Sequence, residues 1–84
     1  MKKGEIFLKS VTVYTTSSCP YCVMVKNFLQ QQNIPFKEIN VEESPQLMFD
    51  LVNKTGQMGV PQIEIDGQWI VGFNPSAIMH ALSN

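Results

Sequence analysis

The chain is predicted to form one α/β domain with the element order β-α-β-α-β-β-α. Two strand-like segments flank a helical one with short joins, which is typical of a βαβ unit with parallel strands. Further along, Asp66-Gly67 separates two strand-like segments and is a strong signal for an antiparallel hairpin. Helical segments precede and follow that hairpin. Residues 1–9 are predicted to be a poorly ordered lead-in, and residues 10–84 to be the folded domain.

The first strand and the first helix are expected between residues 11 and 32. Residues 11–15 are β-branched or aromatic, which favours a strand. Residues 17–20 (Ser-Ser-Cys-Pro) combine small capping residues with a proline suited to a first turn, so a helix should span about residues 20–32. The side of this helix that is predicted to be buried carries Cys22, Val25, Leu29 and Gln32, widened by Met24 and Phe28.

The later elements follow from similar signals. Residues 36–41 alternate in polarity and are predicted to form the second strand. Ser44-Pro45 opens a second helix, which Gly56 ends. Residues 60–65 and 68–71 are the two strands of the hairpin, and Asn74-Pro75 opens the last helix.

Composition limits the classes of function. The formal net charge is −1 and arginine is absent, although arginine is the usual reader of phosphates and base edges. The lysines form no basic run, so we predict neither a nucleic-acid nor a membrane partner. No apolar segment is long enough for a signal peptide or a membrane span, and a cytoplasmic location is expected. In that reducing compartment, a close cysteine pair is more often catalytic or metal-binding than structural.

The only two cysteines, Cys19 and Cys22, are separated by two residues. At the first turn of a helix this spacing lets the sulfurs close into a disulfide or open to a dithiol with little backbone movement. Unpaired N–H groups and the positive end of the helix dipole are expected to lower the pKa of the Cys19 thiol. Cys19 is therefore predicted to attack a disulfide, and Cys22 to resolve the resulting mixed disulfide.

Two other kinds of function stay open at this point. The cysteine pair could hold zinc or an iron–sulfur cluster, although zinc needs four ligands and His80 is the only other soft or borderline ligand in the chain. A binding or adaptor domain would keep the same fold without needing the thiols.

Val60-Pro61 is a second candidate constellation. A proline that opens a strand is often simply an edge-strand residue. With a cis bond before Pro61, however, the N–H and C=O of Val60 could face an incoming extended chain.

Cys19-Pro20-Tyr21-Cys22, followed further along by Val60-Pro61-Gln62-Ile63, resembles the glutaredoxin family, and the resemblance extends over about residues 11–82. It implies a monomer with a thioredoxin-like fold, in which a four-stranded mixed sheet carries helices on both faces. It also implies that Cys19 is the nucleophile, that Cys22 resolves, and that Pro61 is a cis-proline packed against Cys19. No cofactor is expected to be tightly bound, and glutathione is allowed as a co-substrate.

The chain departs from the pattern of glutathione-using glutaredoxins. These usually carry a lysine at the position of Thr16, many carry an arginine at Gln57, and a threonine is common at Gly59. Residues 71–75 (Val-Gly-Phe-Asn-Pro) replace a Gly-Gly followed by an acidic pair. Glutathione has two carboxylates and one ammonium group, so losing charged partners should weaken its binding.

Residues 72–75 are instead similar to the NrdH-type redoxins, which donate electrons to ribonucleotide reductase and are reduced by thioredoxin reductase. The chain is predicted to be a dithiol–disulfide oxidoreductase that reduces protein disulfides or glutathione mixed disulfides, and an NrdH-type redoxin is the alternative. The reductant is glutathione or thioredoxin reductase, and no metal site is expected. Asn74 either caps the last helix, which is favoured, or binds a substrate carboxylate. The predicted substrate groove is lined by Thr16, Tyr21, Gln57, Val60, Pro61, Gly72, Phe73 and Asn74.

Overall fold

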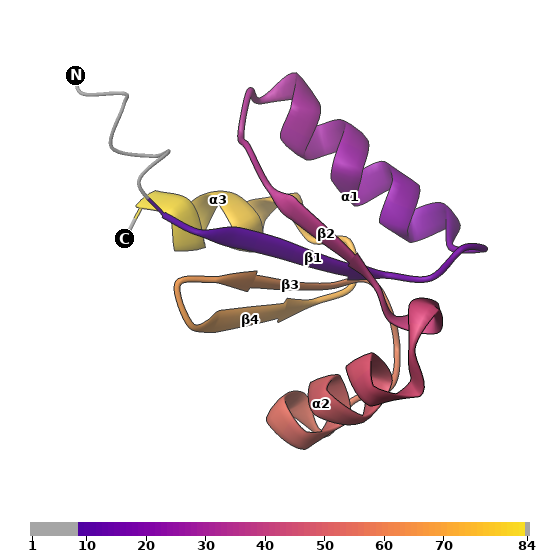
Figure 1. Ribbon diagram of the computed structural model, residues 1–84. Helices are drawn as coiled ribbons and strands as arrows, with labels where there is room; N and C mark the ends of the chain where they lie inside the picture. Colours follow the sequence, from indigo (N-terminus) through magenta and orange to yellow (C-terminus); the bar gives the residue numbers. More distant parts are fainter. Residues whose placement is uncertain (1–8, 84) are drawn as a thin grey trace.

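The computed structural model describes residues 9–83, which form a four-stranded mixed sheet and three α-helices (Figure 1). In chain order the elements are β1 (Val11–Thr15), α1 (Pro20–Gln31), β2 (Lys37–Asn40), the 3₁₀ turn η2 (Val41–Glu43), α2 (Pro45–Thr55), β3 (Gln62–Ile65), β4 (Gln68–Val71) and α3 (Pro75–Ser83). The strands lie in the order β2-β1-β3-β4. β1 is parallel to β2 and antiparallel to β3, and β3 is antiparallel to β4, which confirms the predicted element order and mixed sheet.

Helices cover the two faces of the sheet unequally. α1 and α3 lie on one face and α2 on the other, as predicted (Figure 1). The main core lies on the face of α1 and α3, where Val13, Ile63, Leu29 and Ile78 are fully buried in one cluster. Side chains alternate along a strand, so the neighbour of Val13 points to the other face. There Tyr14 stacks on Trp69 with ring centroids 5.4 Å apart.

Local capping signals set the helix boundaries. Cys19 is the N-cap of α1 and Pro20 its first residue. Ser44 Oγ accepts the Gln46 N–H (3.3 Å) at the start of α2. α2 ends at Gly56, whose φ of 73° lies in the left-handed region that favours glycine. These helix boundaries were predicted correctly from the sequence because each cap is a contact between residues that are close in the chain.

Three elements have predicted boundaries that are wrong by one or two residues. β2 covers Lys37–Asn40 rather than residues 36–41, because Val41 already belongs to η2. β3 begins at Gln62 rather than at residue 60, since Pro61 has no N–H to donate to the ladder. α1 ends at Gln31, and Gln32 is exposed at its C-cap instead of lying on the buried side. Met24 was also expected to widen that side, but it is 44% exposed.

The predicted lead-in over residues 1–9 lies outside the described residues except for Lys9, whose Nζ donates to the carbonyl of Ala81 (2.8 Å). Between residues 9 and 83, no helix is long and apolar enough to cross a membrane.

Candidate active site

The candidate site lies at one end of the sheet. Tyr14 of β1 pairs with Ile39 of β2 and with Gln62 of β3, and Gln62 pairs in turn with Val71 of β4. This register brings together the segments that continue those strands, namely residues 16–19, 41–43, 60–61 and 72–74. The loop before the cysteine pair, the Val60-Pro61 segment and the loop after β4 are therefore neighbours in space although they are distant in sequence.

Cys19 and Cys22 form a disulfide at the N-terminus of α1, with their Cα atoms 5.1 Å apart. Cys19 has the extended backbone of an N-cap, and its Sγ accepts the Cys22 N–H at 3.1 Å. Cys22 is 1% exposed on the buried side of the helix, whereas Cys19 is 9% exposed at the edge of the core. After reduction the same N–H group and the helix dipole favour the thiolate form of Cys19. That Cys19 attacks and Cys22 resolves stays a prediction, which rests on this hydrogen bond and on the difference in exposure.

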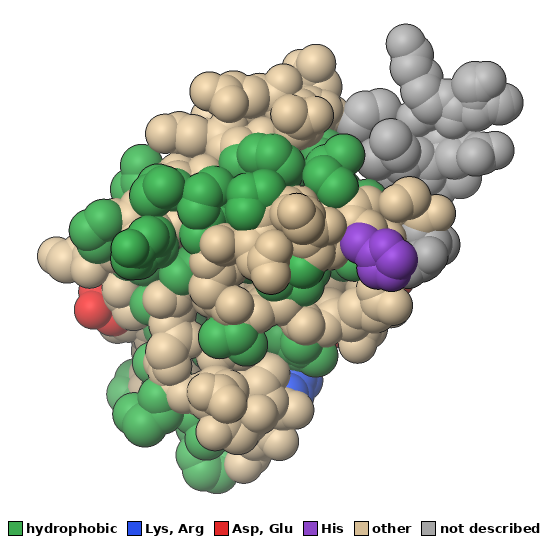
Figure 2. Space-filling view, turned by 180° about the vertical axis from the view of Figure 1, so that it is seen from behind, with side chains coloured by type: hydrophobic (Ala, Val, Ile, Leu, Met, Phe, Trp, Pro, Cys, Tyr) green, Lys and Arg blue, Asp and Glu red, His purple; other side chains and the backbone are tan. Residues whose placement is uncertain are grey.

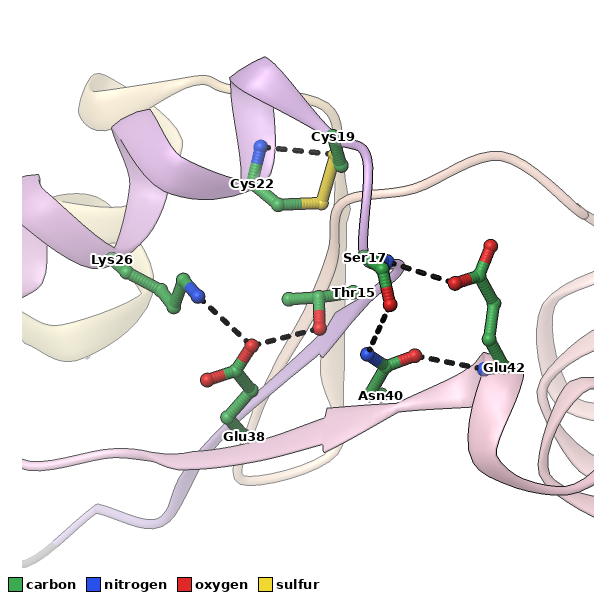
Figure 3. A network of polar contacts seen from close by, with 8 residues as sticks. All are labelled: Thr15, Ser17, Cys19, Cys22, Lys26, Glu38, Asn40 and Glu42. Atoms are coloured by element: carbon green, nitrogen blue, oxygen red, sulfur yellow. Dashed lines mark hydrogen bonds and ion pairs between the residues drawn. A yellow bond between two sulfur atoms is a disulfide. The ribbon is translucent and has the colours of Figure 1, made fainter.

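The loop that leads to Cys19 is held against the end of β2 (Figure 3). Ser17 N–H donates to Glu42 Oε1 (3.0 Å), and Asn40 Nδ2 donates to Ser17 Oγ (3.2 Å). Glu42 N–H donates in turn to Asn40 Oδ1 (2.9 Å), which closes the network. The hydrogen bond from the Ser17 backbone holds the pKa of the Glu42 carboxyl below its usual range. A carboxylate is thus fixed beside the approach to Cys19.

A second polar network ties α1 to the sheet one helical turn from Cys22 (Figure 3). Lys26 Nζ and Thr15 Oγ1 both donate to Glu38 Oε2, at 3.0 Å and 2.9 Å. These two hydrogen bonds, that of Lys26 first, hold the pKa of the Glu38 carboxyl below its usual range. Since Thr15 ends β1 and Glu38 lies on β2, the network fixes the helix that carries the cysteines over two strands.

The Val60-Pro61 peptide bond is cis, as the family resemblance implied. Pro61 is fully buried, and its C=O accepts the N–H of Gly72 at 2.9 Å. Gly72 has a φ of 86°, so a glycine suits this turn at the end of β4. Within the part of the chain that the structure describes, no hydrogen bond engages the N–H or the C=O of Val60. Both groups are therefore available to an extended chain.

Other predicted groove residues lie around this edge of the sheet. Tyr21 is 60% exposed on the first turn of α1, and Thr16 is half-buried just after β1. Phe73 is half-buried and meets Phe28 of α1 edge-on, with ring centroids 6.3 Å apart. Asn74 Oδ1 accepts the Ala77 N–H at 3.1 Å, so Asn74 caps α3, as favoured from the sequence.

Gln57 takes part through its backbone, and within residues 9–83 its exposed side chain makes no hydrogen bond with the other groove residues. Its N–H donates to Thr55 Oγ1 (3.1 Å), and its C=O accepts a hydrogen bond from Gln62 Nε2 (3.1 Å).

Sequence reasoning missed Gln62 and the pair Asn40 and Glu42 as residues that shape the site. The only signal for Gln62 was an amide in a strand whose neighbours Pro61 and Ile63 are apolar. The Asn40 and Glu42 contacts join segments that are 23 and 25 residues apart, and no local pattern announces them.

Metal binding was one of the alternatives left open by the sequence. In residues 9–83, no group of three or more His, Cys, Asp or Glu side chains is arranged to hold a metal ion.

A four-stranded mixed sheet with a Cys-x-x-Cys pair at the start of α1 and a cis-proline before β3 defines a thioredoxin-like redox protein. Residues 11–70 match the glutaredoxin family, and the chain belongs to that family. It is 39% identical over 72 residues to a glutaredoxin of Pseudomonas aeruginosa, covering 86% of this chain and 82% of that protein.

Similarity to NrdH proteins is about as strong. The glutaredoxin-like protein NrdH of Lactococcus lactis is 38% identical over 68 residues, covering 81% of this chain and 93% of that protein. Among solved structures, a thioredoxin-like protein is 29% identical and matches with a TM-score of 0.79, covering 86% of this chain and 99% of that one. The expected thioredoxin-like fold is therefore confirmed.

Proposed function

We propose that this protein reduces protein disulfides or glutathione mixed disulfides by dithiol–disulfide exchange. The observation that carries the proposal is the Cys19–Cys22 disulfide at the start of α1, with the Cys22 N–H on the Cys19 sulfur. Family membership supports thiol–disulfide oxidoreductase chemistry.

The reaction runs in two exchanges. In the reduced protein the Cys19 thiolate attacks one sulfur of the substrate disulfide, and the other sulfur leaves as a thiolate that takes up a proton. The Cys22 thiol then loses its proton and attacks the Cys19 sulfur, which releases the second substrate thiolate. The substrate has gained two electrons, and the Cys19–Cys22 disulfide has formed again.

The surface around the cysteines has features that favour a protein disulfide as the substrate. Tyr21, Val23 and Met24, on the first two turns of α1, are all exposed apolar side chains. The free N–H and C=O of Val60 add a place where a peptide backbone can pair. Elsewhere on the surface, the face seen from behind in Figure 2 also carries a band of hydrophobic side chains and few charged ones.

The identity of the reductant distinguishes this function from a second candidate, that of an NrdH-type redoxin. Glu42 places a carboxylate on Ser17, next to Thr16, where glutathione-using relatives usually have a lysine. That carboxylate repels the carboxylates of glutathione rather than binding them. This contact favours weak dependence on glutathione and supports the alternative of an NrdH-type redoxin, which thioredoxin reductase reduces and which donates electrons to ribonucleotide reductase.

A paired reductase assay tests both the proposed disulfide reduction and the proposed preference of reductant. Reduction of insulin disulfides is followed with glutathione plus glutathione reductase, and separately with thioredoxin reductase alone. We expect activity that disappears in Cys19→Ser, and faster turnover with thioredoxin reductase. Activity that survives Cys19→Ser would favour a binding domain. Clearly faster turnover with glutathione would show that the argument from Thr16, Gln57 and Glu42 is wrong.

Metal analysis provides a separate check. Zinc and iron are measured in protein that has been purified without an affinity metal. A stoichiometric amount of either metal would contradict the redox role and favour a metal- or cluster-carrying module.

A further inference from the structure

We propose that Gln62 is a positioning residue whose buried amide holds the backbone before Val60, so that Val60 presents its N–H and C=O to a peptide substrate. This inference rests on the proposed function, because it concerns how the same site binds protein disulfides. It assigns a role to a side chain that cannot itself touch the substrate, since Gln62 is 0% exposed.

The Gln62 side chain reaches back over the segment that precedes its own strand. Its Nε2 donates to the C=O of Gln57 (3.1 Å) and to the C=O of Gly59 (2.9 Å). The orientation of the amide follows from these two acceptors, because the flipped amide would place its oxygen against two carbonyl oxygens. One buried side chain therefore fixes two backbone positions of the loop.

Stability alone does not account for a glutamine at this position. Gln62 Oε1 is buried and has no hydrogen-bond partner in the described structure. A buried acceptor without a partner is unfavourable, whereas an apolar side chain of similar length would fill the same space without that penalty. What only the amide supplies is its pair of donors, and both are directed at the loop.

The loop depends on side chains to fix its backbone. Residues 56–61 belong to no helix or strand, and a Cβ atom added at Gly59 would meet nothing within 4 Å. Thr55 holds the first part of the loop through the N–H of Gln57, and Gln62 holds Gly59. On the other side of Val60, the C=O of Pro61 is held by Gly72. Val60 is thus fixed from both neighbours while its own backbone groups stay free.

The test uses Gln62→Met, which removes both donors and the unpartnered oxygen while keeping a side chain of similar length. Gln68→Met is the matched control, since Gln68 is an exposed glutamine at the hairpin end of β4. Each variant is assayed with insulin and with bis(2-hydroxyethyl) disulfide, which contains no peptide groups. Melting temperatures are recorded for both.

For Gln62→Met we expect KM for insulin to rise about tenfold. The variant loses two neutral hydrogen bonds that order the loop, and the loss of one or two such bonds corresponds to about a tenfold loss of affinity. The kcat for insulin, the turnover of the small disulfide and the melting temperature should stay at or above the Gln68→Met values. We expect KM to change without kcat because pairing between the Val60 backbone and a peptide stabilises the bound substrate and the transition state equally. An unchanged KM, or equal loss on both substrates in a folded variant, would overturn the proposal.

A measurement on the wild-type protein tests the Gln62 contacts independently of the variants. In ¹⁵N-edited NMR spectra, the side-chain amide protons of Gln62 should exchange with solvent much more slowly than those of Gln68. Equally fast exchange would refute the proposed contacts even if Gln62→Met failed to fold. If the wild-type protein reduced neither substrate while the Gln62 amide stayed protected, the proposed function would fail and the geometry of the loop would stand.

Discussion

Cys22→Ser offers a direct test of how α1 activates Cys19. The substitution removes the second sulfur but keeps the N–H of residue 22, which lies 3.1 Å from Cys19 Sγ. Pro20 has no N–H, so this hydrogen bond is the principal one that the helix start directs at the sulfur. A hydrogen bond to a charged acceptor contributes roughly 1.5–3 kcal/mol, and the helix N-terminus adds roughly 0.3–1 kcal/mol.

Burial opposes this stabilisation, because Cys19 is only 9% exposed. A net effect of roughly 1.4 kcal/mol already shifts the thiol–thiolate equilibrium about tenfold. We therefore expect the thiolate of Cys19 to form at clearly lower pH in Cys22→Ser than in the same protein unfolded in urea.

The assay follows thiolate absorbance in the ultraviolet as the pH is raised. Cys19→Ser is the matched control, since its remaining thiol, Cys22, is 1% exposed on the buried side of α1, and among residues 9–83 no N–H group donates to the sulfur of Cys22. We expect Cys22 in that variant to need higher pH than Cys19 does in Cys22→Ser. Coincident titration curves for the two variants would refute the argument from the helix N-terminus.

Three other predictions concern resolution, packing and pH. Cys22→Ser should still attack glutathione mixed disulfides but lose reduction of protein disulfides, and equal loss of both activities would contradict the resolving role. Leu29→Ala should lower the free energy of urea unfolding by roughly 2–5 kcal/mol, because Leu29 is fully buried; a loss well below that range would mean that the core beneath α1 is loosely packed. The hydrogen bonds from Lys26 and Thr15 hold the pKa of the Glu38 carboxyl in the folded protein below its usual value. The ionised carboxylate therefore stabilises the fold at pH values above that usual pKa, and this contribution is lost as the pH falls through the folded pKa. The stability difference between wild type and Glu38→Gln, from urea unfolding, should therefore shrink on acidification, and a constant difference would exclude the contacts with Lys26 and Thr15 as its cause.

The features that the sequence predicted correctly depend on contacts between near neighbours. The N-cap at Cys19, the C-cap at Gly56 and the hairpin at Asp66-Gly67 each involve a few consecutive residues, and all three are present. The βαβ unit followed because a short join leaves little freedom in how consecutive elements pack.

What the sequence did not reveal depends on strand register. The contacts of Ser17 with Asn40 and Glu42 exist because β1 and β2 pair with Thr15 opposite Asn40. Alternating polarity indicates a strand but not its partner, so such contacts have no local signature. For the same reason, residues 60–61 looked like the start of a strand although the ladder begins at Gln62.

The stacking of Trp69 on Tyr14 has a practical consequence for studies of folding. Trp69 is the only tryptophan in the chain, and it joins β4 to β1 across β3 on the face opposite the main core. Its fluorescence therefore reports whether the hairpin is docked on the rest of the sheet, whereas far-ultraviolet circular dichroism is dominated by the three described helices. If the two signals change together through a denaturant titration, the chain unfolds in one cooperative step. Only then do the free energies of unfolding predicted for Leu29→Ala and Glu38→Gln refer to a single transition.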